Sequence, residues 1–138
     1  MSITKQYAWG LLLLRLVLGL SFAMHGYVKF SDGIENTSSW FDSMGLPGIL
    51  AYGVALLEVM GGLALMAGLA TRLLSSGYIF VMLVAIIKVK FVSGFVGGYE
   101  LELIFLTISL TLLLSEGGLY SIDHLLFPSK NAKRNQFD

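Results

Sequence analysis

The sequence predicts an all-α fold, an integral membrane four-helix bundle with short interfacial helices. Hydrophobic residues make up 56% of the 138 residues and charged residues only 13%, whereas an average soluble domain carries about 25% charged residues. A soluble protein of this size would expose most of its residues to water and would need more polar side chains. In addition, four apolar segments have the composition and length of membrane spans.

These four segments approach or reach the length that a membrane-spanning helix requires, about 17–25 residues. The fourth reaches it only if it begins near Tyr99, which places Glu100 and Glu102 in its first turn, close to the membrane surface. The first is longer than the apolar part of a signal peptide and no small-residue cleavage site follows it, so we expect it to be retained. The predicted spans are Ala8–Lys29, Ile49–Leu69, Leu73–Lys90 and Tyr99–Ser115.

The connection between the first two spans is the one sizeable loop. This loop, Ser31–Gly48, is expected to contain a short capped helix that begins near Ser38. Trp40 and Phe41 of that helix would lie in the membrane interface, where aromatic side chains are enriched. The other two connections are expected to be tight turns.

After the fourth span, a short apolar stretch at residues 119–127 predicts a second interfacial helix. Ser121 or Asp123 would cap it by accepting hydrogen bonds from its first backbone N–H groups. The predicted organisation is therefore one four-span membrane domain at residues 1–128, followed by a polar cytoplasmic tail at residues 129–138.

Basic residues near the span ends predict the orientation, because they favour the cytoplasmic side. With four spans, both termini lie on one side, which carries five basic residues against three on the other. We therefore expect a multi-pass protein of the cell membrane with both termini in the cytoplasm. The cytoplasmic group is Lys5, Arg72, Lys130, Lys133 and Arg134, and the opposite group is Lys29, Lys88 and Lys90.

The composition excludes several kinds of chemistry. The chain has no cysteine, which removes disulfides, thiol redox reactions, iron–sulfur ligation and thiolate zinc sites. Its net charge is zero, so no overall field favours nucleic acid. The two histidines, His25 and His124, fall on opposite sides of the membrane in this topology and cannot be paired haem ligands. No metal site is expected, and His124 is expected to lie outside the functional site.

Ionisable residues inside a span are costly to bury and therefore mark candidate functional sites. Glu58, a candidate catalytic residue, lies about 14 Å into the second span at 1.5 Å per residue. At that depth it must be protonated, paired or facing an internal cavity. Arg15, a candidate ligand-binding residue, has a similar predicted depth, so we expect an ion pair between the two. The alternatives are a neutral or purely structural Glu58 and an Arg15 that reaches up to the interface.

Further polar residues gather at the outer ends of the spans. His25 is a candidate for ligand contact or proton transfer, with a simple hydrogen bond to the backbone as the alternative, and Lys29 lies one turn further along as a candidate ligand-binding residue. Lys88, Glu100 and Glu102 are candidate ligand-binding residues at the ends of the third and fourth spans. The alternative for these three is that they complement helix dipoles and form salt bridges.

The order and spacing of these motifs resemble those of the DoxX family of small bacterial membrane proteins. The resemblance spans roughly Leu12 to Asp123, and it differs from the usual family pattern at Gly117, where proline is frequent. The matching motifs are Leu14-Arg15-Leu16, Gly19, His25-Gly26 and Lys29-Phe30 in the first span; Gly45-Leu46-Pro47, Glu58, Gly61-Gly62, Gly68 and Arg72 in and around the second; Gly97-Gly98-Tyr99-Glu100 at the start of the fourth; and residues 117–123 at the close.

The resemblance implies an oxidoreductase subunit in the membrane. Some members resemble the small subunit of thiosulfate:quinone oxidoreductase, whereas the CatD/MhqP-like branch accompanies catechol- or quinone-detoxifying enzymes. The absence of cysteine favours the second branch. The expected function is therefore that of a membrane subunit of a quinone-linked oxidoreductase or of a quinone/catechol detoxification system, which binds a small redox-active ligand in the bundle.

Such a role requires a bound quinone, another cofactor, or a partner that carries electrons. A quinone would suit an apolar groove with a few polar groups; His25, Arg15 and Glu102 could bond its oxygens and Glu58 could take a proton. The expected partners are the lipid bilayer, a redox subunit or quinone/catechol-processing enzyme, and a second copy of the chain. The alternative is a small transporter or a membrane scaffold for a peripheral enzyme, because buried charges also mark transport pathways.

Overall fold

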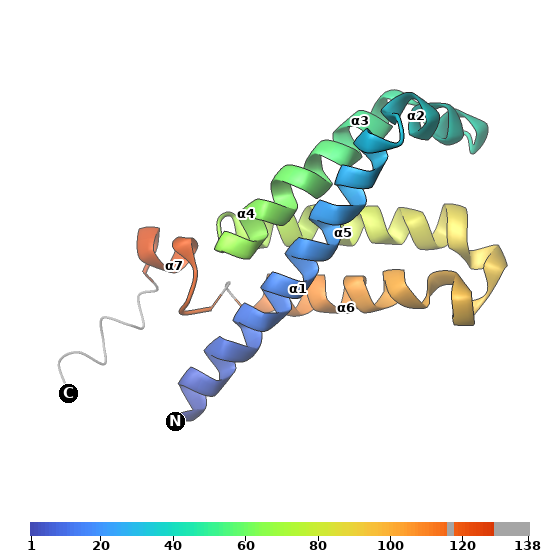
Figure 1. Ribbon diagram of the computed structural model, residues 1–138. Helices are drawn as coiled ribbons and strands as arrows, with labels where there is room; N and C mark the ends of the chain where they lie inside the picture. The colour runs from blue at the N-terminus through green and yellow to red at the C-terminus, as the bar shows by residue number, and fades with distance from the viewer. Residues whose placement is uncertain (116–117, 129–138) are drawn as a thin grey trace.

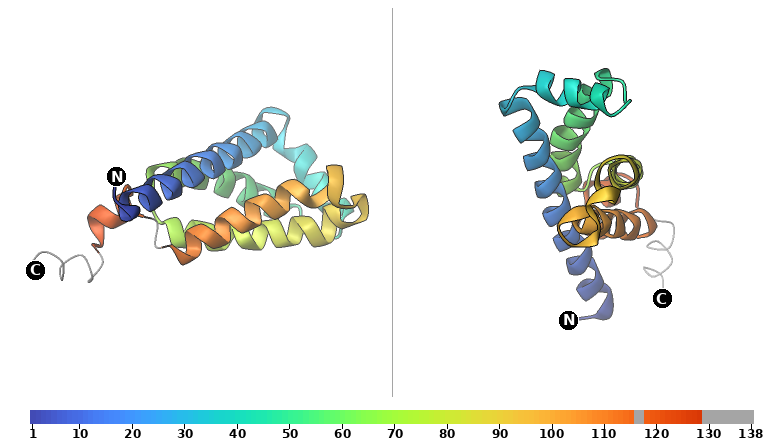
Figure 2. Two further views of the ribbon diagram at one scale, coloured as in Figure 1. Left: turned by 90° about the horizontal axis from the view of Figure 1, so that it is seen from below. Right: turned by 90° about the vertical axis from the view of Figure 1, so that its right-hand side faces the viewer.

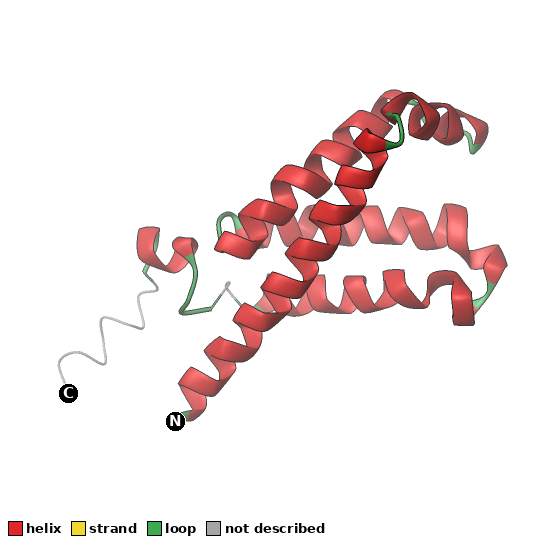
Figure 3. Cartoon of the chain, in the orientation of Figure 1, coloured by secondary structure: helices red, strands yellow, loops and turns green. Residues whose placement is uncertain are grey.

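A computed structural model describes residues 1–115 and 118–128 of the chain. Within these residues all regular secondary structure is helical, which confirms the predicted class (Figure 3). The predicted tail at residues 129–138 lies outside the described residues. Four helical segments are long and apolar enough to cross a membrane, as the sequence predicts: Ile3–Ser31, Ile49–Ala67, Thr71–Ser93 and Phe95–Leu114.

Several of these spans are built from more than one helical piece. The first is a single helix, the second contains a π-helical turn in its middle, and the third ends in a π-helical and a 3-10 turn. The elements in chain order are α1 (Ile3–Ser31), α2 (Ile34–Ser43), α3 (Ile49–Leu56), η1 (Leu57–Gly61), α4 (Gly62–Ala67), α5 (Thr71–Ala85), η2 (Ile86–Lys90), η3 (Phe91–Ser93), η4 (Phe95–Tyr99), α6 (Glu100–Leu114) and α7 (Ile122–Leu126).

The first span is longer than predicted at its N-terminal end. It begins at Ile3 rather than Ala8, because the Ser2 hydroxyl accepts a hydrogen bond from the backbone N–H of Lys5 and caps the helix. The second span ends where predicted to within two residues, since Gly68 adopts a left-handed conformation with φ of 77°.

The interfacial helix α2 also begins earlier than predicted. Gly33, with φ of 97°, directs the chain out of α1 and stands at the N-cap of α2. The predicted cap at Ser38 is therefore wrong, and this serine lies inside the helix. Both Trp40 and Phe41 lie on α2 as predicted, with their rings 5.8 Å apart.

The four spans pack as two antiparallel hairpins. α1 lies along η1 and α4, and α5 lies along α6 (Figures 1 and 2). The N-terminal end of α1 and the short helix α7 lie at one end of the molecule. From that end the two hairpins diverge toward α2 and the turn that joins α5 to α6 (Figure 1).

Glycines allow the two helices of the first hairpin to approach closely. A Cβ atom on Gly19 would lie 2.5 Å from the Gly62 carbonyl oxygen, and one on Gly62 would lie 2.7 Å from the Ala23 backbone nitrogen. Neither backbone can move away without separating the helices. Small residues serve this purpose at helix interfaces in membranes, where packing rather than water exclusion drives association.

The core between the hairpins is aromatic at its centre. The rings of Phe22 on α1 and Tyr78 on α5 stack with centroids 3.9 Å apart, and Phe105 on α6 lies 5.4 Å from Phe22. All three side chains are buried, together with Leu18, Leu65 and Leu112 along the same axis. This contact joins three of the four spans.

Residues 118–128 bind the end of the bundle at which α1 begins. The sequence offered Ser121 or Asp123 as the cap of the short helix in this segment, and the Ser121 hydroxyl caps α7. The Asp123 carboxylate instead accepts hydrogen bonds from the backbone N–H groups of Ala70 and Thr71, both at 2.7 Å. It therefore caps the start of α5, on a different span, and the Asp123 N–H donates to the Gly68 carbonyl at 3.0 Å.

We predict that Gly62→Ala destabilises the bundle by about 1–3 kcal/mol, the usual cost of forcing extra volume into a packed contact. The measurement is thermal unfolding in detergent. Gly10→Ala on α1 is the matched control, because no atom lies within 4 Å of the new Cβ there. That control should keep or slightly raise the unfolding temperature. Equal effects of the two substitutions would show that the close contact does not limit packing.

Candidate functional site

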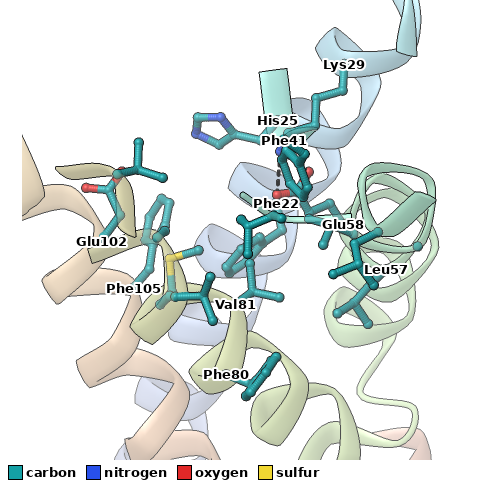
Figure 4. A pocket seen from close by; sticks show the side chains of 18 of the residues that line it. Phe22, His25, Lys29, Phe41, Leu57, Glu58, Phe80, Val81, Glu102 and Phe105 are labelled. Atoms are coloured by element: carbon teal, nitrogen blue, oxygen red, sulfur yellow. Dashed lines mark hydrogen bonds and ion pairs between the residues drawn. The ribbon is translucent and has the colours of Figure 1, made fainter. Parts of the chain in front are cut away.

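A pocket of about 530 Å³ lies between the two hairpins, on the side of the bundle that carries α2 (Figure 4). Its walls come from α1, α2, the α3–η1 region, the α5–η2 region and α6. Most of the lining is apolar, and its charged side chains are few: Lys29, Glu58, Lys90 and Glu102, with His25 as a further polar group. An apolar cavity with a small number of polar groups is the usual form of a small-molecule site.

The first charged pair joins Lys29 on α1 to Glu58 in η1. The Lys29 Nζ donates to Glu58 Oε1 at 2.7 Å and also contacts Oε2. The Glu58 side chain is 5% exposed and that of Lys29 is 25% exposed. A carboxylate at this depth therefore has a countercharge, which reduces the cost of keeping it ionised away from water.

Local backbone features place Glu58 at this position. A Cβ on Gly26 would lie 2.8 Å from the Glu58 Cβ, so glycine there lets η1 approach α1. η1 is a π-helical turn, a feature that occurs frequently at functional sites. The hydroxyl of the buried Tyr78 donates to the Leu57 carbonyl of this turn at 3.1 Å, which ties η1 to α5.

The second charged pair lies on the other hairpin. Lys90 Nζ, at the end of η2, is 4.0 Å from Glu102 Oε1 on α6, and the Glu102 side chain is 15% exposed. The Glu102 Oε2 atom is buried and accepts no hydrogen bond from the described residues. Glu102 shares one face of α6 with the buried residues Phe105 and Ser109. This carboxylate therefore has unused acceptor capacity inside the pocket.

His25 connects α1 to the second hairpin. Its ring lies edge-on to Phe105, with centroids 6.2 Å apart. Phe105 follows Glu102 by three residues on the same helix face, so His25 lies on the Glu102 side of the pocket, as Figure 4 shows. Lys29 and Glu58 lie on its other side in this view. Four of the seven predicted site residues thus converge: His25, Lys29, Glu58 and Glu102.

The predicted pair between Arg15 and Glu58 is wrong. Arg15 lies at the opposite end of the bundle, where its Nη2 donates to the Tyr120 carbonyl and its Nη1 lies close to Gly68. Glu58 pairs with Lys29 instead. Arg15 does not line the pocket. Its buried guanidinium instead binds the backbone of the C-terminal segment at Tyr120.

Two further predicted residues also lie outside the pocket lining. Lys88 is exposed, and its place in the pocket is taken by Lys90. Glu100 accepts a hydrogen bond from the Gly97 N–H at 3.3 Å and so stabilises the turn before α6. His124 lies on α7, away from the pocket, as expected.

Several lining residues were not predicted from the sequence. The sequence predicts a role for Lys90 only in the orientation and for Trp40 and Phe41 only at the membrane interface, yet all three line the pocket. The place of Trp40 and Phe41 near the site could have been inferred from chain order, because α2 directly follows the end of α1 that carries His25 and Lys29. Among the described residues, no group of three or more His, Cys, Asp and Glu side chains could hold a metal ion.

Comparison with known proteins places these observations in a family context. The sequence model of the DoxX family matches residues 10–91. The chain is 36% identical to "Putative oxidoreductase CatD" of Bacillus subtilis (strain 168), over 91% of this chain and 93% of that protein. It is 37% identical to "Inner membrane protein YqjF" of Escherichia coli (strain K12), over 85% of this chain and 92% of that protein. No solved structure matches the chain.

We predict that Lys29 and Glu58 are energetically coupled. Glu58→Gln and Lys29→Met should each lower stability, toward the about 3–5 kcal/mol seen when one member of a buried pair is removed. The double variant should recover part of the loss, because neither charge is then stranded. The measurement is a double-mutant cycle on thermal unfolding in detergent.

The same cycle with Arg15→Met in place of Lys29→Met is the control. Arg15 and Glu58 lie at opposite ends of the bundle, so their effects should add. An additive Lys29–Glu58 cycle would mean that the pair contributes no coupling to the fold.

Proposed function

This chain belongs to the DoxX family, and we propose that it is the membrane subunit of a quinone-linked oxidoreductase or of a quinone/catechol detoxification system. In this proposal the pocket between the hairpins binds a small redox-active ring. The relative named "Putative oxidoreductase CatD" supports the general class of chemistry. The four apolar spans make this a multi-pass membrane protein in contact with the bilayer.

The observation that carries the proposal is the placement of two lysine–carboxylate pairs on different hairpins around one apolar cavity. A quinone has two carbonyl oxygens on opposite sides of a flat ring. In this proposal Lys29 and Lys90 donate to these oxygens, and hydrogen bonds from charged donors are about twice as strong as neutral ones. After reduction, the same ring carries two hydroxyl groups, and Glu58 and Glu102 can accept hydrogen bonds from them.

The remaining lining suits a flat ring. Four aromatic side chains line the cavity beside the charged pairs: Phe22, Trp40, Phe41 and Phe105. Aromatic side chains favour offset or edge-to-face contact with another ring. An apolar wall also keeps water away from the pairs and so strengthens their interaction with the ligand.

Reduction of a quinone to a quinol requires two electrons and two protons. In this proposal the electrons come from a partner protein that carries a redox cofactor, and the protons pass through the pocket. Glu58 and His25 are the groups that would transfer them, because both line the cavity and both can gain and lose a proton. Arg15, which the sequence placed among the ligand-binding residues, has no part in the pocket.

We predict that a naphthoquinone quenches the fluorescence of Trp40. The chain has two tryptophans, Trp9 and Trp40, and Trp9 packs against Tyr120 with ring centroids 5.2 Å apart, away from the pocket. The experiment therefore uses a Trp9→Phe background. Lys90→Met should weaken binding of the quinone, and Glu102→Gln binding of the corresponding quinol, each about 10- to 100-fold, as expected for loss of one hydrogen bond to a charged group.

Lys88→Met and Glu100→Gln are the matched controls, since they remove the same charges from neighbouring positions outside the pocket lining. Both should bind within about threefold of the parent protein. If no quinone or catechol quenches Trp40, the redox proposal fails. Uptake of a solute by liposomes that contain the protein, with no redox ligand bound, would then favour the transporter alternative.

We also propose that both termini face the cytoplasm, which places the pocket near the outer side of the membrane. The basic-residue count supports this orientation, and an even number of spans puts the termini on one side. A reporter fused at the C-terminus that is active only in the cytoplasm should be active, and one that is active only outside should be silent. The reverse pattern would place the pocket on the cytoplasmic side.

A further inference from the structure

The packing between α3 and α5 is sparse. Each hairpin is closely packed internally, α1 along η1 and α4 and α5 along α6, but α3 and α5 make little direct contact with each other. The two hairpins approach at Leu57, the first residue of η1 after α3, and Gly77 on α5, where a Cβ on Gly77 would lie 3.4 Å from Leu57. From that point toward α2 they separate (Figure 1).

Glycines leave this seam unfilled. No atom lies within 4 Å of the position that a Cβ on Gly53 would take, and a Cβ on Gly77 would meet only Leu57. Phe80 beside them is 70% exposed. The seam is the set Gly53, Val54 and Leu57 on the first hairpin and Gly77, Phe80 and Val84 on the second, and all six residues line the pocket.

The seam and the charged pairs are therefore two ends of one cavity. Leu57 of the seam is followed directly by Glu58 of the first ion pair, and the seam itself contains no polar side chain. Both flanking helices are membrane spans, so the exposed side of the seam faces hydrocarbon. The cavity thus has a polar end inside the bundle and an apolar end that opens sideways to lipid.

The size of the cavity also exceeds what one ring occupies. A cavity of about 150 Å³ is sufficient to hold a benzene molecule, whereas this one measures about 530 Å³. A ring held between Lys29 and Lys90 would leave the seam end unfilled. An apolar chain attached to the ring would fill it.

We propose that the ligand is a membrane-resident quinone with a hydrocarbon tail, which leaves the pocket through the seam between α3 and α5. The ring lies between the two charged pairs, and the tail passes over Gly53 and Gly77 into the bilayer. This inference rests on the proposed quinone function and adds the substrate class to it. It also gives the two glycines a role, because any larger side chain would occupy the path of the tail.

The test compares two probes that share one ring. The first is 2-methyl-1,4-naphthoquinone, and the second is the same ring with a tail of four isoprene units. Binding is followed by Trp40 quenching in lipid nanodiscs with the Trp9→Phe background. Affinities are expressed as the ratio of variant to parent for each probe, so that partitioning of the tailed probe into lipid cancels.

Gly53→Leu and Gly77→Leu are the test variants. Each should weaken binding of the tailed probe at least about tenfold and leave binding of the ring alone within about threefold. Gly10→Leu is the matched control, since Gly10 lies on α1 in open space and outside the pocket lining. It should affect neither probe, and thermal unfolding confirms that all three variants are folded.

The outcomes separate this inference from the function on which it rests. If the parent protein binds the ring but the seam variants bind the tailed probe normally, or lose both probes equally, the path of the tail is wrong and the quinone site stands. If a tailed alcohol without the ring competes as well as the tailed quinone, the seam is a general lipid site and the proposed substrate class is wrong. If neither probe binds the parent protein, both proposals fail.

Discussion

The central physical constraint on this protein is the cost of placing a carboxylate in the middle of a membrane span. Glu58 is nearly fully buried and is neutralised by Lys29 from the neighbouring span. This pair fixes the register of α1 against the second span, since Gly26 must lie opposite Glu58 for the two backbones to come close enough. The same register brings Gly19 opposite Gly62 and Arg15 opposite Gly68. One electrostatic requirement thus determines how the first hairpin is assembled.

Much of the fold can be predicted from the sequence, because hydrophobic length and glycine turns are local properties. The four spans, the tight turn after Gly68 and the Ser121 cap follow directly from such patterns. The partner of Glu58 could not be predicted in this way, because it depends on the relative position of two helices. The register places Gly26 against Glu58. Arg15 precedes Gly26 by eleven residues on the same helix and therefore lies about 16 Å further along it.

Lys90 lines the pocket where Lys88 was expected. This difference also comes from helix geometry that the sequence pattern does not reveal. Pocket-facing positions on α5 include Gly77, Val81 and Val84, which have the spacing of a regular α-helix with 3.6 residues per turn, so such a helix would next present a residue near 88. The π-helical turn η2 has more residues per turn and moves the face onward, to Val89 and Lys90. Sequence periodicity assumes a regular helix, and this site lies where the π-helical turns η1 and η2 interrupt the regular helix.

The hydrogen bonds from Ala70 and Thr71 to Asp123 have a consequence for how the protein is made. These amides lie at the turn between the second and third spans, yet their acceptor is separated from them by more than fifty residues of chain. During synthesis that turn enters the membrane region long before Asp123 leaves the ribosome. The two hairpins can therefore insert one after the other, but the turn acquires its final cap only when the chain is almost complete, so that translation order makes closure of the bundle a late event.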